Sequence, residues 1–162
     1  MEAPETQVPS LPEPPNGMYT ARVDSAGRLK LPVDIERYFA GLPEKKLFVT
    51  SLNRRTGQVY PIQAWRANRK FISSYTAEPE VLARVNFNAQ HYGADVEMDG
   101  QGRILLPPAM RRRLGIENQT VHVFFYNERM EIYSEAIFQE MDQAAEQTSP
   151  DDVTTLERAG MK

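Results

Sequence analysis

Hydrophobic and polar positions alternate in short stretches along the chain, and turn signals separate the stretches. Residues 19–23 and 29–31 alternate on either side of 24–28, which predicts two strands joined by a tight turn. Pro32 fits the first position of a short helix, predicted over 33–40. The first part of the chain therefore begins as strand, turn, strand and helix.

The same alternation continues beyond this helix and then gives way to helical periods. Further strands are predicted over 47–52 and 58–61 around a hairpin loop, and Ile62, Trp65, Arg69 and Ile72 mark one helical face. Pro79 opens a second helix. The later elements are predicted to be strands over 94–98, 104–106, 121–125 and 130–133, a helix over 108–114 and a last amphipathic helix that includes Met141.

The later elements repeat the earlier ones. The pentapeptide at 24–28, Asp-Ser-Ala-Gly-Arg, returns 75 positions later at 99–103 as Asp-Gly-Gln-Gly-Arg. The positions of Leu29, Leu31 and Pro32 are taken 75 residues later by Ile104, Leu106 and Pro107. One structural unit is therefore used twice, and a unit this short needs its own copy to bury its apolar face.

The predicted fold class is α+β, mainly β. Two tandem repeats would interleave as a pseudo-two-fold, closed β-barrel with flanking helices, because closure removes sheet edges. The expected division is a disordered Pro-rich tail at 1–16, a first unit at 17–65, linking helices at 66–91, a second unit at 92–137, a C-terminal helix at 138–147 and a disordered acidic tail at 148–162. Met18 is a candidate native start, a point that the sequence leaves open.

Composition and charge limit the classes of function. The chain has no cysteine, which excludes disulfides, thiolate zinc sites and a cysteine nucleophile. No long apolar run predicts a membrane span or export, so a cytoplasmic location is expected. The net charge of −3 is unevenly distributed: residues 1–16 carry −3 and 140–162 carry −4, which leaves +4 on the body. A basic body is compatible with a DNA-binding surface.

The two turns hold the strongest candidates for binding. Asp24 and Asp99 would cap the turns, Gly27 and Gly102 would take positive φ, and Arg28 and Arg103 would stand at strand ends. A guanidinium held in this way suits a phosphate or a guanine edge. The alternative is that each aspartate only staples its own arginine, and both hold together if the aspartate aims the side chain.

Neighbouring basic residues rank the first turn above the second. Arg22 and Lys30 are expected to flank the first turn on the face opposite Val23 and Leu29, so Arg28 is the preferred contact. Basic runs at 111–113 and 54–55 are expected to be solvated faces or phosphate contacts.

The sequence contains no constellation typical of an enzyme. His91 and His122 are the only histidines, His122 is expected at the surface, and no phosphate loop, nucleophile elbow or zinc-ligand spacing occurs. Trp65 and Phe138 stand at similar places in the two copies and are expected to be core anchors. No catalytic residue, metal ligand, cofactor or small-molecule substrate is predicted.

On these residues the chain resembles the MraZ family, which is built from two AbrB/SpoVT-type swapped-hairpin units. The resemblance covers about residues 17–140 and rests on Asp-x-x-Gly-Arg followed by an apolar pair and proline, at 24–32 and 99–107, with Gly17, Tyr60-Pro61 and Trp65. It departs from the family at Ala26 and Gln101, where a lysine is frequent, which bears on affinity rather than on fold.

The resemblance implies a bacterial transcriptional regulator that binds DNA sequence-specifically. It would be nucleoid-associated and assemble as a homo-oligomeric ring on short direct repeats at the promoter of the cell-division and cell-wall operon. The motif arginines fall on Arg28 and Arg103. The alternative is an antitoxin-like or scaffolding oligomer that mainly binds protein, which the acidic tail keeps open.

Overall fold

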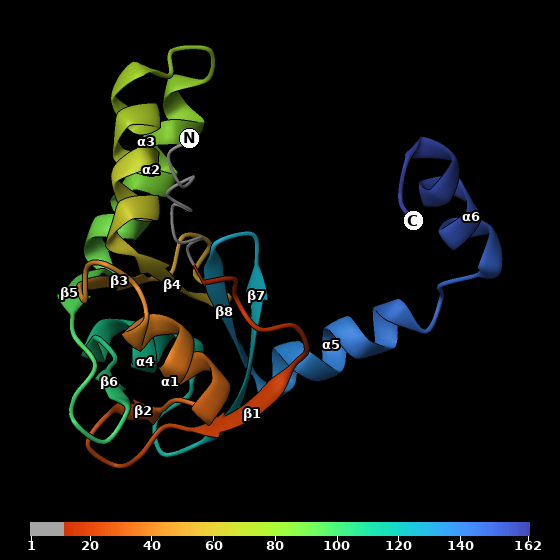
Figure 1. Ribbon diagram of the computed structural model, residues 1–162. Helices are drawn as coiled ribbons and strands as arrows, with labels where there is room; N and C mark the ends of the chain where they lie inside the picture. The colour runs from red at the N-terminus through yellow and green to blue at the C-terminus, as the bar shows by residue number, and fades with distance from the viewer. Residues whose placement is uncertain (1–11) are drawn as a thin grey trace, which may run out of the picture.

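The computed structural model describes residues 12–162, whose strands and helices follow one another in two similar successions (Figure 1). The strands are β1 (Tyr19–Arg22), β2 (Arg28–Lys30), β3 (Leu47–Thr50), β4 (Gly57–Pro61), β5 (Ala94–Val96), β6 (Arg103–Leu105), β7 (Thr120–Tyr126) and β8 (Arg129–Ser134). The helices are α1 (Val33–Ala40), α2 (Ile62–Ser74), α3 (Pro79–His91), α4 (Pro108–Leu114), α5 (Glu135–Ala145) and α6 (Pro150–Ala159). The α+β class is confirmed. The expectation of a mainly β chain is wrong, because the helices cover more of residues 12–162 than the strands do.

The sheets join the two halves of the chain strand by strand. A six-stranded antiparallel sheet has the order β1-β7-β8-β4-β3-β5, and β2 pairs with β6 in a separate ribbon. The two halves are equivalent in these sheets. If each strand is exchanged with its counterpart, the same orders result, read from the other end; the counterparts are β1 and β5, β2 and β6, β3 and β7, and β4 and β8. Each strand pairs with at least one strand of the other half, so the predicted interleaving is confirmed.

The predicted closed barrel is wrong. The large sheet ends at β1 and β5, and within residues 12–162 a single bridge, between Val23 and Leu29, links it to the β2–β6 ribbon. The ribbon strands are three residues long because Pro32 and Pro107 follow closely and start the helices α1 and α4. A proline has no N–H with which to continue a ladder to a sheet edge.

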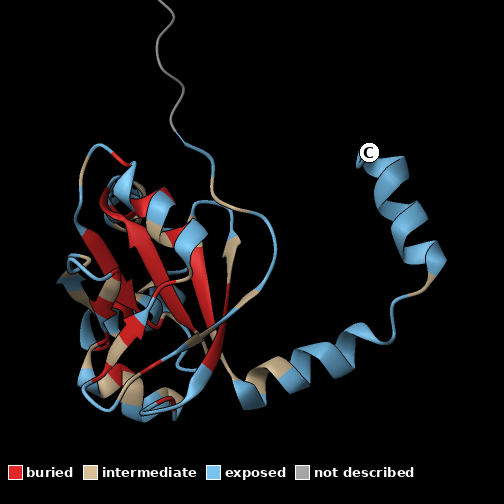
Figure 2. Ribbon diagram, turned by 60° about the horizontal axis from the view of Figure 1, so that its bottom comes forward, coloured by how far each residue is buried: buried red, intermediate tan, exposed pale blue. Residues whose placement is uncertain are grey.

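The core lies between one face of the large sheet and the ribbon with α1 and α4. Leu29 and Ile104 from the ribbon and Ile35 and Met110 from the helices are fully buried against the sheet. Figure 2 shows these buried strands enclosed by exposed helices and turns. This main core takes its side chains from both halves of the chain, so its formation requires both.

Helices cover the other face of the large sheet unequally. In the first half, α2 and α3 form a hairpin that lies on the sheet. Phe48 of β3 and Trp65 of α2 stack there at 4.3 Å between ring centroids, and Ala89 of α3 is fully buried. In the second half, α5 alone lies against β7 and β8, where His122 and Phe138 stack at 3.8 Å. His122 is therefore largely buried, contrary to the expectation of a surface residue, because its ring takes the place of Phe48.

A buried polar pair marks the centre of the large sheet. Gln58 of β4 lies directly opposite Glu131 of β8, and the Gln58 Nε2 donates to the Glu131 Oε2 at 3.0 Å. The two residues occupy equivalent positions in the two halves. Gln58 precedes Val59, which pairs with Val49 of β3, and Glu131 precedes Ile132, which pairs with Val123 of β7. Both are nearly inaccessible to solvent.

The two ends of the described chain differ from the expected division. Among residues 12–16 there is no helix or strand, and the rest of the predicted Pro-rich tail lies outside the described residues. The helix expected at 138–147 begins earlier, at Glu135, because Ser134 caps it by accepting the Ile137 N–H. Likewise α2 begins at Ile62, inside the expected first unit.

The acidic tail is helical where the sequence analysis expects disorder. Pro150 opens α6, and Ser149 and Asp152 form a capping box at 149–152. Every residue of α6 is exposed (Figure 2). Within the described residues, each helix is too short or too polar to cross a bilayer.

Candidate nucleic-acid interface

The turn between β1 and β2 is closed by its aspartate. The Asp24 Oδ1 accepts the backbone N–H groups of Ala26 and Arg28, each at 2.9 Å, and the Gly27 N–H donates to the Asp24 carbonyl at 3.0 Å. Gly27 has φ of +84°, a conformation that a side chain disfavours. The predicted turn-shaping roles of Asp24 and Gly27 agree with this geometry.

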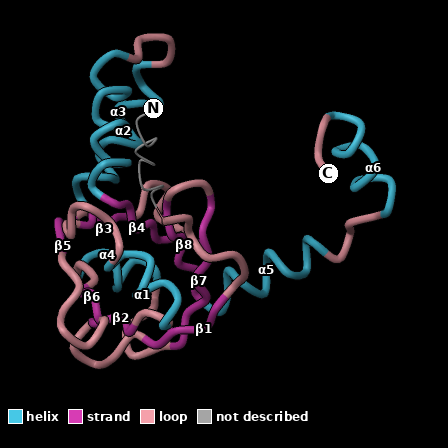
Figure 3. The backbone as a smooth tube through the Cα atoms, viewed as in Figure 1, coloured by secondary structure: helices cyan, strands magenta, loops and turns pink. Residues whose placement is uncertain are grey.

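The turn between β5 and β6 repeats the arrangement. The Asp99 Oδ1 accepts the N–H groups of Gln101 at 2.8 Å and Arg103 at 3.0 Å, and Gly102 has φ of +73°. The two turns lie on the side of the molecule opposite the α2–α3 hairpin (Figure 3). They lead into opposite ends of one short ribbon, because strands β2 and β6 pair antiparallel.

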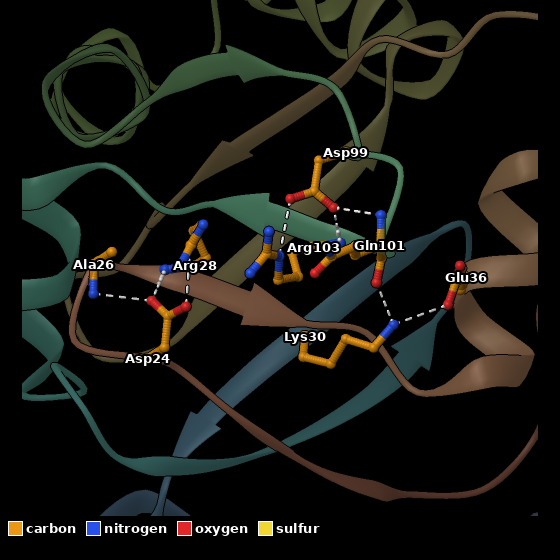
Figure 4. Close-up of polar contacts among 8 residues, drawn as sticks. All are labelled: Asp24, Ala26, Arg28, Lys30, Glu36, Asp99, Gln101 and Arg103. Atoms are coloured by element: carbon orange, nitrogen blue, oxygen red, sulfur yellow. Dashed lines mark hydrogen bonds and ion pairs between the residues drawn. The ribbon is translucent and has the colours of Figure 1, made fainter.

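Each turn ends in an arginine that its own aspartate holds. The Arg28 Nε donates to the Asp24 Oδ2 at 3.0 Å, and the Arg103 Nε donates to the Asp99 Oδ2 at 2.9 Å. Within residues 12–162, these bonds use only the Nε, so the terminal nitrogens of each fork are not engaged (Figure 4). The Arg28 side chain is 40% exposed and that of Arg103 is 25% exposed. Both are stapled and still able to bind an anion or a guanine edge bidentately.

The hydrogen bonds within the turns lower the pKa of both aspartates. The backbone N–H of Arg28 contributes most to lowering the pKa of the Asp24 carboxyl, and the N–H of Arg103 does the same for Asp99. A carboxylate with a lowered folded-state pKa stabilises the fold above its unfolded pKa and loses this contribution as pH falls through the folded value. We expect ¹³C NMR titration of the side-chain carboxyls to give midpoints for Asp24 and Asp99 below the usual value of about 3.9. Midpoints at or above that value would mean that the turns are open in solution.

Of the two further predicted contacts, Arg22 lies beside the first turn as expected and Lys30 does not. Arg22 is exposed, and its NH2 donates to the Asn118 carbonyl at 3.1 Å and to the Asn118 Oδ1 at 2.9 Å. Lys30 does not join the first turn. Its Nζ contacts the Gln101 carbonyl and pairs with the Glu36 carboxylate at 3.2 Å, because the antiparallel β2–β6 register places Lys30 opposite Arg103 (Figure 4).

The other basic runs divide between surface and interior. Arg112 and Arg113 are exposed, as expected of a solvated face, whereas the Arg111 side chain is 14% exposed and lies against Gly27. Arg55 pairs with Glu140 of α5 at 2.6 Å. The Arg54 Nε donates to the Asn88 Oδ1 at 2.7 Å.

Sequence reasoning missed the residues beneath the turns. A Cβ atom on Gly27 would overlap the Arg111 guanidinium, and one on Gly102 would overlap the Glu36 carboxylate. Glu36 and Arg111 are 75 positions apart, which is the repeat distance. The repeat alignment therefore contained the signal of a charge reversal, but only the interleaved fold places it under the turns.

The site has no feature of a metal centre. Among residues 12–162, no cluster of three or more histidine, cysteine, aspartate or glutamate side chains is placed to hold a metal ion. The chemistry available at the two turns is that of guanidinium groups facing solvent.

The duplicated α+β chain, with matched Asp–Arg turns on one ribbon, defines a class of two-repeat proteins. The family model described as "MraZ protein, putative antitoxin-like" matches residues 93–158. The Transcriptional regulator MraZ of Acidobacterium capsulatum is 31% identical over 145 residues, which cover 87% of this chain and 96% of that protein. Proteins of the same name from Koribacter versatilis and Methylobacillus flagellatus are 32% and 30% identical over 67% and 66% of this chain, and 75% and 72% of their own lengths. The chain belongs to the MraZ family. This is a family of transcriptional regulators rather than of enzymes.

Proposed function

We propose that this chain is a sequence-specific DNA-binding transcriptional regulator that contacts double-stranded DNA through Arg28 and Arg103. The supporting observation is that both guanidinium groups are aimed by an aspartate through Nε while their terminal nitrogens stay unengaged. The bonds to Asp24 and Asp99 fix the arginines before binding, so less side-chain entropy is lost in the complex. Arg22, exposed beside the first turn, adds positive charge for phosphate contacts, whereas Lys30, beside the second turn, is paired with Glu36.

The proposal includes a place of action and a set of partners. A cytoplasmic, nucleoid-associated protein without cofactor or metal fits the lack of cysteine and the basic body between acidic ends. From the family we infer binding to short direct repeats at the promoter of the cell-division and cell-wall operon. The swapped-hairpin description of each unit belongs to the same proposal.

The assembly would be a homo-oligomeric ring, and α6 is our candidate for a contact between copies. α6 follows α5 after residues 146–149, as α3 follows α2 after residues 75–78, and both helices begin with proline. Ala89 of α3 is buried against the sheet, whereas Val153 and Leu156 of α6 are 41% and 55% exposed. A helix of ten residues is marginal alone in water, so a second copy of this chain is the occupant that we propose for its apolar side.

Replacing Leu156 by aspartate is expected to lower the assembly state. The substitution places a charge among the apolar side chains of α6, while the core that contains Ile35 and Met110 is untouched. Light scattering after size exclusion should show a lower mass, approaching the 18.5 kDa of one chain. Thr155→Asp adds the same charge on another side of α6 and should keep the wild-type mass. Equal masses for both variants would remove α6 from the interface.

The direct test of the proposed function is a gel shift with the DNA upstream of the chain's own gene. This DNA should be retarded more than a scrambled duplex of equal length. The logarithm of the binding constant should fall linearly with the logarithm of the salt concentration. If the two duplexes were bound equally at every salt concentration, sequence-specific regulation would be excluded.

A second candidate, an antitoxin-like or scaffolding oligomer that mainly binds protein, is favoured by the exposed helix α6 and by the family model's description. A pull-down with residues 148–162 as bait separates the two. Capture of one partner protein in stoichiometric amounts, with no gel shift, would favour the second candidate.

A further inference from the structure

Each turn of the ribbon rests on a helix from the other half of the chain. The Gly27 carbonyl accepts the Leu106 N–H at 2.9 Å, and the Gly102 carbonyl accepts the Leu31 N–H at 2.9 Å. These bonds place the first turn on α4 and the second on α1. The side chains in contact with the glycines, Arg111 and Glu36, stand at equivalent positions in the two halves.

The first turn therefore lies on a buried cation. The Arg111 NH1 donates to the Leu106 carbonyl, and its Nε lies 3.5 Å from the Glu117 Oε1. That Nε is the one buried side-chain nitrogen or oxygen in residues 12–162 that lacks a hydrogen bond. Glu117 is itself 55% exposed, so water screens its charge more than it screens that of Arg111. The positive charge of Arg111 adds to that of Arg28 above it.

The second turn lies on an anion. The Glu36 carboxylate contacts Gly102 and takes the Lys30 ammonium as its partner, so the lysine beside this turn is already neutralised. Glu97 stands, exposed, at the position that corresponds to Arg22 beside the first turn. Arg103 is also the less exposed of the two arginines.

From these contacts we propose that the two turns contribute unequally to DNA binding. Arg111 positions the first turn and adds positive charge beneath it, which makes this turn the primary DNA contact. Glu36 places negative charge beneath the second turn and weakens its contact with DNA. This inference rests on the proposed function and deepens it. A subunit with two equal turns could bind a duplex in either direction, because its halves are related by a pseudo-two-fold axis. A subunit with one strong and one weak turn binds the duplex in one orientation, which is what binding sites arranged as direct repeats require.

Glu36→Gln tests the inference, since it removes the anion and leaves the shape of the second turn. We expect the operator Kd to fall about threefold or more, and log K to depend more steeply on log salt by up to about one. Glu80→Gln removes the same charge from exposed α3, far from the ribbon in Figure 1, and should change neither quantity. A Glu36→Gln variant that binds with wild-type affinity and salt dependence would overturn the inference.

A double-mutant cycle keeps the test specific to the second turn. Arg103→Ala should weaken binding more in the Glu36→Gln background than in the wild type, because Arg103 carries more of the contact once the negative charge beneath the second turn is gone. Equal losses in the two backgrounds would also overturn the inference. The wild-type protein tests the proposed function separately: if it shows no preference for the operator over a scrambled duplex, the proposed function fails, whatever the variants do.

Arg111 provides the reciprocal measurement. Arg111→Gln should weaken operator binding and lower the salt dependence although the side chain is too buried to touch DNA, and Arg111→Lys should restore part of both. Thermal unfolding of each variant identifies any loss that is due to folding. Arg111→Gln with an unchanged melting temperature and wild-type binding would contradict the positioning role.

Discussion

Replacing both turn arginines by alanine is expected to reduce operator affinity at least about thirtyfold, because each well-placed arginine contact contributes roughly 1–3 kcal/mol. Several subunits engaged on neighbouring repeats would multiply the loss. Of the single variants, Arg28→Ala should cost more than Arg103→Ala. The order follows from exposure and from the charges beneath the turns. Gel shifts or fluorescence anisotropy at two salt concentrations would measure these losses.

The fold should survive this double substitution. Both Asp–Arg pairs are partly exposed, and exposed ion pairs contribute little to the free energy of unfolding. Asp24 and Asp99 keep their bonds to the backbone N–H groups, which close the turns. Arg84→Ala on α3 removes a charge from an exposed position away from the ribbon and should leave binding unchanged. If Arg28→Ala bound normally while Arg103→Ala did not, the ranking of the turns would be reversed.

Local signals in the sequence were sufficient for the short helices and for the turns. The predicted ranges 33–40 and 108–114 coincide with α1 and α4, because each helix follows a proline that fixes its start. The Asp-x-x-Gly-Arg pattern predicted the positive φ at glycine and offered the Asp–Arg staple as an alternative, since all the groups involved lie within five residues. The repeat itself predicted that the halves interleave.

Features that depend on distant partners were not predictable in this way. Alternation placed Lys30 on the correct face but assigned it to the wrong turn, because its neighbours come from the antiparallel strand β6 of the other half. The burial of Arg111 depends on the same cross-half contact. His122 follows a strand pattern that predicts exposure, yet Phe138 of α5 covers it. The polar composition of α6 hid a helix whose capping box was nonetheless present in the sequence at 149–152.

The asymmetry between the halves also has a structural use at the centre of the sheet, where equivalent positions meet each other. Gln58 and Glu131 are counterparts that pair across the β4–β8 contact. An identical repeat would place two glutamates or two glutamines there. The Gln58 side chain instead donates to the Glu131 Oε2 at 3.0 Å and to the Thr56 hydroxyl at 2.9 Å, while the Arg129 Nε donates to the Glu131 Oε1 at 2.6 Å. One amide and one carboxylate satisfy the site.

Gln58→Glu, which makes the two halves identical at this point, is therefore expected to destabilise the protein by about 2–4 kcal/mol at pH 7. The change removes both amide donors and brings a second carboxylate against Glu131. Two carboxylates at this distance raise the pKa of one of them above the usual value of about 4.3. The folded variant then binds more protons than the unfolded chain, so lowering the pH from 7 toward 4.3 should return part of the lost stability.

Urea unfolding of the wild type and the variant at pH 7 and pH 5 would measure this recovery as a smaller difference in the free energy of unfolding at pH 5. Gln90→Glu makes the same chemical change at an exposed position of α3 and should cost little at either pH. A deficit of the same size at both pH values would mean that lost packing, rather than the paired carboxylates, destabilises the variant. A recovery at pH 5 would show that two carboxylates at position 58 and its counterpart destabilise the interleaved sheet.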